Sequence, residues 1–216
     1  MNRRFLLFTC ISMLCLLANA QSKLDRKYRV SAKLGGASYT QSDMNATFGA
    51  TIGGGVEFDI TRNTALLTGL NLAKRGGEGS SSIGLLEVSA YYLEIPVEYR
   101  FYNFFSRIDE WDSVDLFVAI SSHLSCGLFG RSNANAYTKT STSGGEYREE
   151  QIEAISQGTF SSSGIRRFDV GIGAKMGVVL SDHYECSIGA DIGLINVKGP
   201  VNGHNFQVFV GLAYLW

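Results

Sequence analysis

Residues 48–60 read FGATIGGGVEFDI. From Phe48 to Ile60 every second residue is apolar or glycine, and the residues between them are glycine, threonine or acidic. This period of two is typical of a β-strand with one apolar face and one polar or glycine-lined face. The stretch therefore predicts a strand, and the same alternation recurs along most of the chain.

Seven further stretches show this alternation, and they are residues 28–34, 66–72, 91–101, 116–128, 168–178, 184–194 and 206–216. The sequence thus predicts an all-β fold of eight strands, several of them longer than the usual five or six residues. Helical spacing is nearly absent. The exception is residues 146–157, where the spacing of Ile152 and Ile155 predicts a short helix.

The connections between the predicted strands alternate in length. The short turns are 61–63 and 181–183, and the long polar links are 35–46, 75–84, 131–164 and 197–203. The first short turn pairs Ile60 with Thr64, and the second pairs Leu180 with Tyr184, so the apolar residues stay on one face. Short turns on one rim and long loops on the other predict an eight-stranded antiparallel up-and-down transmembrane β-barrel with both termini in the periplasm.

Aromatic residues lie near the ends of the predicted strands, as expected for girdles at the two membrane interfaces. They are Tyr91, Tyr99, Phe101, Tyr184, Tyr214 and Trp216. One longer link, 104–113, interrupts the short-turn rim, and its Phe104, Phe105 and Trp111 have the character of interface aromatics.

The same eight strands could also close as a soluble, periplasmic, lipocalin-like barrel that binds an apolar ligand. The charged face would then point to water and the apolar face would line a cavity. Glycine favours the membrane alternative, because it weakens a solvent-exposed strand but makes room for long side chains in a narrow lumen. The glycines of the polar face are Gly49, Gly53, Gly55, Gly171, Gly173, Gly177, Gly189 and Gly193.

The first 20 residues have the features of a secretory signal peptide. Arg3 and Arg4 precede an apolar run that ends near Leu17, and Ala18-Asn19-Ala20 is a cleavage site of small residues. The apolar run is shorter than the roughly 20 residues of a membrane-spanning helix. We therefore expect residues 1–20 to be removed and residues 21–216 to form the barrel domain.

The balance of charge argues against nucleic acid as a partner. The 216 residues carry a formal net charge of −1, which becomes −3 when the two arginines of the signal segment are removed, so bulk electrostatic attraction to nucleic acid is absent.

The face predicted to line the lumen carries charged residues of both signs. The cations are Arg29, Lys33, Arg100, Arg167 and Lys175, and the anions are Glu57, Asp59, Glu94, Glu98, Asp169, Glu185 and Asp191. Because side chains fill an eight-stranded barrel, these groups should pair and close the interior to wide-pore diffusion. We expect Lys175 to pair with Asp191, and Pro96, which also points inward, to produce a nearby bulge.

Catalytic and metal-binding patterns are weak. His123 shares the inward face with Ser121 and Ser125, but residues two apart on a strand do not form a dependable nucleophile–base pair. A lumen histidine within a hydrogen-bond network is therefore expected. His183 and His204 lie on other elements without metal-ligand spacing, and the glycines at 53–55 lie inside a strand rather than before a helix. We predict no enzyme activity, no cofactor and no metal site; an outer-membrane protease or lipid-modifying enzyme would need an acidic and histidine cluster at the loop rim.

Two cysteines, Cys126 and Cys186, remain after the signal segment. They fall on outward-facing positions of the predicted fifth and seventh strands, with the sixth strand between them. Adjacent strands are about 4.8 Å apart, whereas a disulfide needs Cα atoms within about 7 Å. Two free, lipid-facing thiols are therefore predicted, even in an oxidising compartment.

Three motifs resemble those of a known family. Residues 92–99, YLEIPVEY, are similar to the "leiPl.y" signature of the small PorT-like outer-membrane β-barrels of Bacteroidota, and residues 168–177, FDVGIGAKMG, resemble a later strand of that family. The last three residues, Tyr214-Leu215-Trp216, are similar to the C-terminal aromatic signal read by the barrel-assembly machinery. The resemblance implies a porin-like barrel of the cell envelope, in contact with outer-membrane lipid, and implies no particular activity.

The longest link, residues 131–164, is rich in serine, threonine, glycine and asparagine. A link of this length is usually functional or disordered. It would either shield the surface or recognise an extracellular partner. The predicted function is thus structural, or surface binding through this loop.

Overall fold

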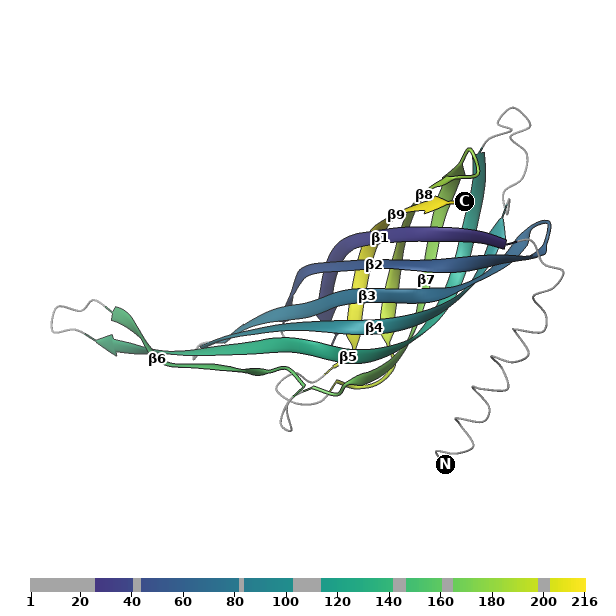
Figure 1. Ribbon diagram of the computed structural model, residues 1–216. Helices are drawn as coiled ribbons and strands as arrows, with labels where there is room; N and C mark the ends of the chain where they lie inside the picture. The colour runs from purple at the N-terminus through teal and green to yellow at the C-terminus, as the bar shows by residue number, and fades with distance from the viewer. Residues whose placement is uncertain are drawn as a thin grey trace, which may run out of the picture.

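The computed structural model describes residues 26–40, 44–81, 84–102, 114–141, 147–160, 165–197 and 203–216. Its nine strands (Figure 1) are β1 (Arg26–Tyr39), β2 (Met44–Thr61), β3 (Thr64–Ser81), β4 (Gly84–Tyr102), β5 (Val114–Ser141), β6 (Tyr147–Gly158), β7 (Phe168–Leu180), β8 (Tyr184–Gly193) and β9 (Asn205–Leu215). The described residues include no helix that is long and apolar enough to cross a membrane. The predicted signal segment and the link 104–113 lie outside these residues.

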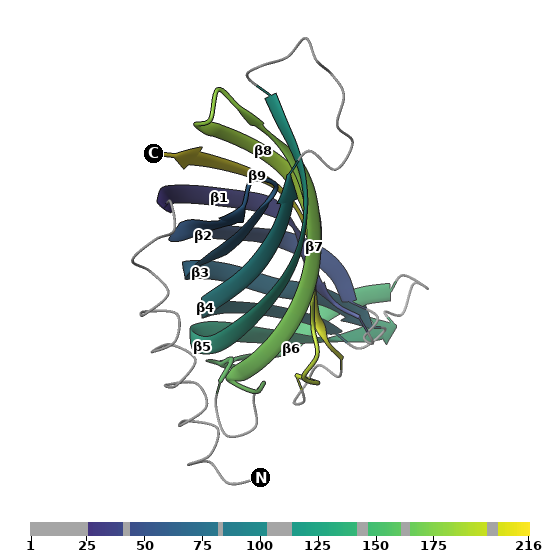
Figure 2. The ribbon, with the colours of Figure 1, turned by 90° about the vertical axis from the view of Figure 1, so that its right-hand side faces the viewer.

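Eight of the strands form a closed antiparallel barrel, as predicted. The sheet runs β4-β3-β2-β1-β9-β8-β7-β5, and β4 also pairs with β5, which closes the ring. Figures 1 and 2 show β1 to β5 side by side on one wall and β7 to β9 on the opposite wall. Tyr28 and Trp216 exchange two backbone hydrogen bonds of 2.9 Å at the junction of the chain's first and last strands. The first and last strands of the chain, β1 and β9, are therefore joined in one continuous ladder.

The remaining strand, β6, lies outside the barrel. It pairs with the distal part of β5, from Arg131 opposite Gly158 to Ser141 opposite Tyr147, and the resulting hairpin projects beyond the barrel rim (Figure 1). The short helix predicted for residues 146–157 is therefore wrong for the described part of that range. Pairing with β5 satisfies the backbone hydrogen bonds of this segment and outweighs the weak helical spacing of its two isoleucines.

The strands continue into several links predicted as loops. β1 continues to Tyr39, β3 to Ser81 and β5 to Ser141, so the predicted loops 35–46, 75–84 and 131–164 are largely strand. Their glycine and serine residues obscure the alternation of side chains. The neighbouring backbone nevertheless supplies a partner at each step, as in the β3–β4 hairpin, which stays paired up to Ser81 opposite Gly84.

The strands that leave the two short turns pair in the predicted register, but the residues of the first turn itself do not. Leu180 pairs with Tyr184, as expected. At the other turn Asp59 pairs with Ala65, in the predicted register, but a bulge then places Thr61 opposite Thr64, so Ile60 has no opposite residue.

The predicted bulge beside Pro96 is absent from the described ladders. β3 and β4 keep one register on both sides of Pro96, with an interruption between the pairs Thr68–Val97 and Asn71–Glu94. The register shift between β4 and β5 falls instead at Tyr91 and Tyr92. Proline has no backbone N–H to donate. The ladder accommodates this by a local gap in pairing and not by an inserted residue.

The barrel is apolar outside and charged inside. Along β7 exposed and buried residues alternate, with Phe168, Val170 and Ile172 exposed and Asp169 buried. The same order holds on β9, where Val208, Val210 and Leu212 face outward. A lipocalin-like barrel would have the opposite arrangement. The exposed apolar band is what a membrane-spanning barrel presents to lipid.

Aromatic residues gather at the rim of the short turns. Trp216 stacks on Tyr28 with ring centroids 6.3 Å apart and on Tyr214 at 6.0 Å, and Tyr214 contacts Tyr184 at 5.5 Å. All four are exposed on the outer wall. They form the girdle predicted for one membrane interface.

Candidate functional site

The candidate site is the charged interior of the barrel, which contains two clusters of ion pairs. The cluster nearer the short turns is centred on Arg100 of β4, whose side chain has no exposed surface. Arg100 Nε lies 2.6 Å from Glu98 Oε1, and Arg100 Nη1 lies 2.8 Å from Glu185 Oε2 and 3.1 Å from Glu57 Oε2. One guanidinium thus contacts carboxylates from β2, β4 and β8, as its forked set of donors allows.

Two further cations complete this cluster. Arg29 Nη2 lies 2.9 Å from Glu185 Oε2, and Lys175 Nζ lies 3.0 Å from Glu98 Oε1 and 3.2 Å from Glu185 Oε1. The Tyr102 hydroxyl donates a hydrogen bond to Glu57. Three cations therefore meet three carboxylates, so the formal charges of the cluster balance. Such balance is needed because an unpaired charge inside a protein is costly.

The aromatic ring of Phe117 lies against two cations of this cluster. The Arg100 guanidinium lies 4.7 Å from the ring centroid and Lys175 Nζ lies 5.5 Å from it. These distances allow a cation–π attraction in addition to the ion pairs.

The second cluster is centred on Arg75 of β3. Arg75 Nη2 lies 2.5 Å from Glu94 Oε1, and its Nη1 lies 3.9 Å from Asp169 Oδ2. Ser125 donates to Glu94 at 3.2 Å, and Asn205 donates to Asp169 at 2.7 Å. This cluster links β3, β4, β5, β7 and β9, and it lies farther from the short turns than the first cluster.

The predicted pair between Lys175 and Asp191 is not formed. Both side chains are buried inside the barrel, in the register predicted for β7 and β8, with Lys175 opposite Gly189. However, Lys175 reaches Glu98 and Glu185, while Asp191 lies 3.8 Å from Lys33 Nζ. The flexible lysine turns toward the end of the lumen where two carboxylates converge.

Glycines make the space for these side chains, as predicted. A Cβ added at Gly173 would overlap the carboxylate of Asp191, and one added at Gly193 would overlap that of Asp169. At Gly189 the added atom would lie 2.7 Å from Lys175 Cβ. Beside the first cluster lies a cavity of about 30 Å³, bordered by Arg29, Asn71, Pro96, Glu98 and Lys175 among others. That volume is on the scale of one or two water molecules.

An apolar cluster lies over the charged interior at the end opposite the short turns. It consists of Tyr39, Val88, Ala90, Tyr92, Ile165 and Val197, all buried. Ile165 and Val197 come from the segments on either side of β7 and β8, and these are joined by a 2.9 Å hydrogen bond from Arg166 N to Val197 O. Tyr92 also contacts Phe160 edge to face at 5.6 Å. Connecting segments therefore fold inward over this end of the lumen.

The histidine and serines examined for catalysis are not arranged as a nucleophile and its base. His123 is buried, and its Nε2 lies 3.4 Å from Arg75 Nη2, whereas Ser125 donates to Glu94. His123 is thus a lumen residue in a polar network, as predicted. His183 lies in the β7–β8 turn, where its Nδ1 is 2.5 Å from the Ser181 carbonyl oxygen, and His204 precedes β9.

Two arginines, Arg75 and Arg167, lie in positions that differ from the predicted ones. Arg167, expected inside, is exposed, and its Nη1 donates to the carbonyl oxygens of Gly127 and Leu128 at 3.1 and 3.3 Å. It lies just before β7, where alternation has not yet begun. Arg75 begins the predicted link 75–84 but is a buried residue of β3. Leu70 and Leu72 face outward, so extending their alternation through Ala73 to Arg75 would have identified it.

Cys126 on β5 and Cys186 on β8 are free cysteines. The strand β7 lies between them, as predicted. Cys186 is exposed on the outer wall and Cys126 is half-buried.

Comparison with solved structures gives small outer-membrane barrels of low sequence identity. Neisserial surface protein A is 12% identical, with a TM-score of 0.44, over 88% of this chain and 96% of that chain. Ail of Yersinia pestis, in a complex with the heparin analogue sucrose octasulfate, is 11% identical, with a TM-score of 0.42, over 89% and 99%. The N-terminal β-barrel domain of Pseudomonas aeruginosa OprF is 13% identical, with a TM-score of 0.39, over 90% and 100%. Among curated proteins, no sequence matches this chain.

A comparison with protein families gives a match over most of the chain. The family is described as "Outer membrane protein beta-barrel domain", and its model matches residues 18–199. That range contains eight of the nine strands and both ionic clusters apart from Asn205. The closed barrel, its apolar outer band and its charged interior agree with this match. The chain therefore belongs to the outer-membrane protein β-barrel domain family.

Proposed function

We propose that this protein is a non-enzymatic outer-membrane barrel with a closed interior, and that it acts at the cell surface through the β5–β6 hairpin. The observation that carries the closed interior is the arrangement of Arg100, which contacts three carboxylates from three strands in the middle of the lumen. Because side chains fill an eight-stranded barrel, these pairs block the passage of hydrated solutes in the proposed state. The ionic clusters serve as a plug.

Planar-bilayer recording tests the plug. The purified protein, refolded in detergent and added to a lipid bilayer, should give no steady open-channel current, whereas a general porin in the same bilayer gives stepwise currents. Steady conductance from the heat-modifiable, folded form of the protein would overturn the proposal of a closed interior.

A non-enzymatic role is supported by the polar partners of His123 and Ser125, which share the inward face of β5. His123 faces Arg75, and Ser125 donates to Glu94, so neither is positioned to activate the other. Their contacts instead hold the second cluster together.

The surface role is supported by the construction of the hairpin. β5 is 28 residues long, and its distal part leaves the barrel to pair with β6. At the base of the hairpin, Ser156 donates to Asn133 at 2.8 Å and Ser132 to Thr159 at 3.3 Å. A paired, anchored hairpin can present residues to an extracellular partner at low cost in conformational entropy.

Surface proteolysis tests the placement of the hairpin. On intact cells, trypsin should cut after Lys139 or Arg148 while the barrel remains in the membrane. A variant in which residues 134–155 are replaced by Asn-Gly retains the Asn133–Ser156 pair and should resist this cleavage. Cleavage only after the cells are broken would place the hairpin in the periplasm and overturn its proposed role.

We further propose that the chain is of the PorT-like type found in Bacteroidota and that its first 20 residues are removed on export. The motifs 92–99 and 168–177 support the first proposal, and they lie in β4 and at the start of β7. The signal-like pattern that ends at Ala20 supports the second. N-terminal sequencing of the protein from outer membranes should begin at Gln21.

A further inference from the structure

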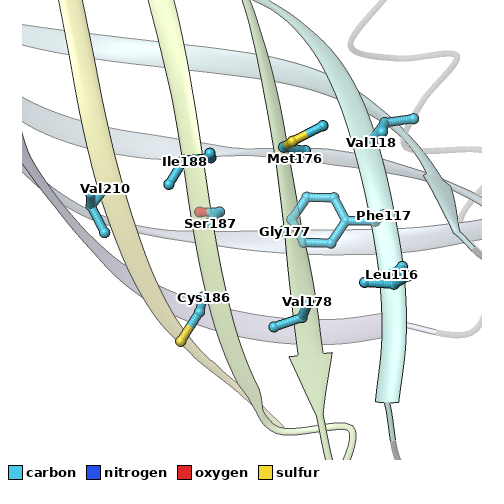
Figure 3. A pocket seen from close by; sticks show the side chains of 10 residues that line it. All are labelled: Leu116, Phe117, Val118, Met176, Gly177, Val178, Cys186, Ser187, Ile188 and Val210. Carbon is cyan, nitrogen blue, oxygen red and sulfur yellow. The ribbon is translucent and has the colours of Figure 1, made fainter.

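An apolar hollow lies on the outer wall of the barrel, away from the charged interior. It has a volume of about 430 Å³ and extends over β5, β7, β8 and β9 (Figure 3). This volume is within the range of about 300–1,000 Å³ typical of small-molecule sites. None of the ten residues that line it is charged.

Two rows of outward-facing side chains form the sides of the hollow. In the first row, Val118 pairs with Met176, Met176 with Ile188, and Ile188 with Val210. In the second row, which is nearer the short turn, Leu116 pairs with Val178 and Val178 with Cys186. Figure 3 shows the two rows one above the other.

The floor of the hollow is backbone. The residues between the two rows are Phe117, Gly177 and Ser187, and they belong to the inward-facing set. Phe117 and Ser187 are buried, and Gly177 has no side chain. A Cβ at Gly177 would lie 2.9 Å from the Phe117 ring, so the ring occupies the lumen side directly beneath the floor.

Cys186 leaves the hollow open at its lower end, which is the end nearer the short turn. It is the smallest side chain of its row, which otherwise contains leucine and valine, and it is exposed. Met176 and Ile188 in the upper row are themselves half-exposed, at 50% and 56%. The hollow is thus accessible from the membrane side and bounded by apolar atoms.

The position of the hollow relates it to the aromatic girdle. Tyr184 precedes Cys186 by two residues, which corresponds to about 7 Å along a strand. Tyr184 belongs to the exposed aromatic group with Tyr214 and Trp216, and such girdles lie at the level of the lipid headgroups. The hollow therefore begins just on the hydrocarbon side of the interface and is continuous with the lipid-facing band.

We propose that this hollow is a binding site for one acyl chain of a membrane phospholipid in the leaflet at the short-turn rim. An acyl chain of the adjacent leaflet that lies along this hollow makes dispersion contacts with the side chains of both rows. Because none of the lining residues is charged, the site selects the chain and not the headgroup. It differs from ordinary lipid contact in that the chain lies between two rows of side chains, over Gly177, which has no side chain of its own.

Native mass spectrometry of the full-length mature barrel tests this site. The protein is reconstituted in nanodiscs of palmitoyl-oleoyl phosphatidylethanolamine and phosphatidylglycerol, and is then released into a mild detergent. We expect the folded wild-type protein to retain one phospholipid, with no preference between the two headgroups. Cys186→Trp, which fills the lower end of the hollow, should reduce the retained fraction at least threefold.

Cys126→Trp is the matched control, because it makes the same substitution at the other free cysteine, outside the hollow, and it should retain lipid like the wild type. If Cys186→Trp does not give the heat-modifiable folded form, Cys186→Leu takes its place, with a smaller reduction expected. Equal retention by wild type and the Cys186 variant, equal loss in the Cys126 control, or a lipid-free folded wild type would each overturn the proposal. A dimer that Cys186→Trp dissociates would assign the hollow to a second copy of the chain instead.

Discussion

Arg100 of β4 and Glu185 of β8 form a 2.8 Å ion pair across the interior of the barrel, although β5 and β7 separate their strands in the wall. The same carboxylate oxygen of Glu185 also receives Arg29 of β1 at 2.9 Å. One acidic residue thus links the two walls that Figures 1 and 2 show facing each other. Removing either partner should weaken the barrel as a whole.

Replacing Arg100 by methionine should strongly destabilise the folded barrel. The substitution keeps an unbranched side chain, about as long as the apolar stem of arginine, but leaves Glu57, Glu98 and Glu185 without their shared cation. Breaking a buried ion pair in this way costs about 3–5 kcal/mol. Urea unfolding in lipid vesicles, followed by the gel shift between folded and unfolded forms, measures the loss.

Arg62→Met serves as the control for this substitution, because Arg62 is exposed in the β2–β3 turn and should change stability by less than about 0.5 kcal/mol. The double variant with Glu185→Gln should lose less than the sum of the two single variants, since the pair is already broken. Strict additivity would mean that the two residues do not interact energetically.

Gly171→Ala should destabilise the barrel by overfilling the lumen. The added Cβ would overlap the imidazole of His123 and lie 2.8 Å from the Ile192 carbonyl oxygen. Overpacking of this kind costs about 1–3 kcal/mol, measured by the same unfolding experiment. Adding His123→Ala should recover part of the loss. Gly36→Ala, whose Cβ would meet only Ala46 Cβ at 3.6 Å, should be tolerated.

Both cysteines of the mature protein should be free thiols. Unfolding the protein without reductant, in the presence of N-ethylmaleimide, should add two labels to the intact mass. A sample that was reduced first should give the same mass. Labelling only after reduction, together with a peptide joining Cys126 and Cys186, would contradict the strand order, because β7 lies between their strands.

The protein should require detergent for extraction from cells. The outer wall exposes large apolar side chains such as Ile120, at 62%, and Leu212, at 60%, and these need a hydrocarbon environment. Fractionation should place the protein in the outer membrane, and the extracted form should migrate differently on gels before and after heating. Recovery as a soluble periplasmic protein would contradict the assignment.

The register of the barrel could be predicted from the sequence because two local rules determine it. A period of two fixes which side chains share a face, and a short turn then fixes which residues lie opposite each other. The pair Leu180–Tyr184, and from it Lys175 opposite Gly189, follows from these rules alone.

The partners inside the lumen could not be predicted in this way. Lys175 selects between carboxylates on neighbouring and distant strands, and the selection depends on the tilt and curvature of the closed barrel. Its partner Glu98 lies two strands away, on β4. Local alternation contains no information on that distance.

The extent of the strands was underestimated for a different reason. Beyond the membrane band, side chains are no longer divided between lipid and lumen, so the alternation fades while the backbone pairing continues. The strand β6 lies outside the predicted strands for this reason, whereas Arg75 lies where the alternation of β3 still continues. Extending the alternation of Leu70 and Leu72 by two or three residues would have found Arg75, but no comparable signal marks β6.

The unbroken course of β5 has a mechanical consequence. This strand runs from Val114 near the short-turn rim to Ser141 in the hairpin, and it is paired with β4 from Phe117 to Ala136. A load applied at the tip of the hairpin, along its axis, would therefore act on many parallel hydrogen bonds at once, in shear, and would not peel them apart one by one. The hairpin is built as a tether whose strength comes from the barrel wall itself.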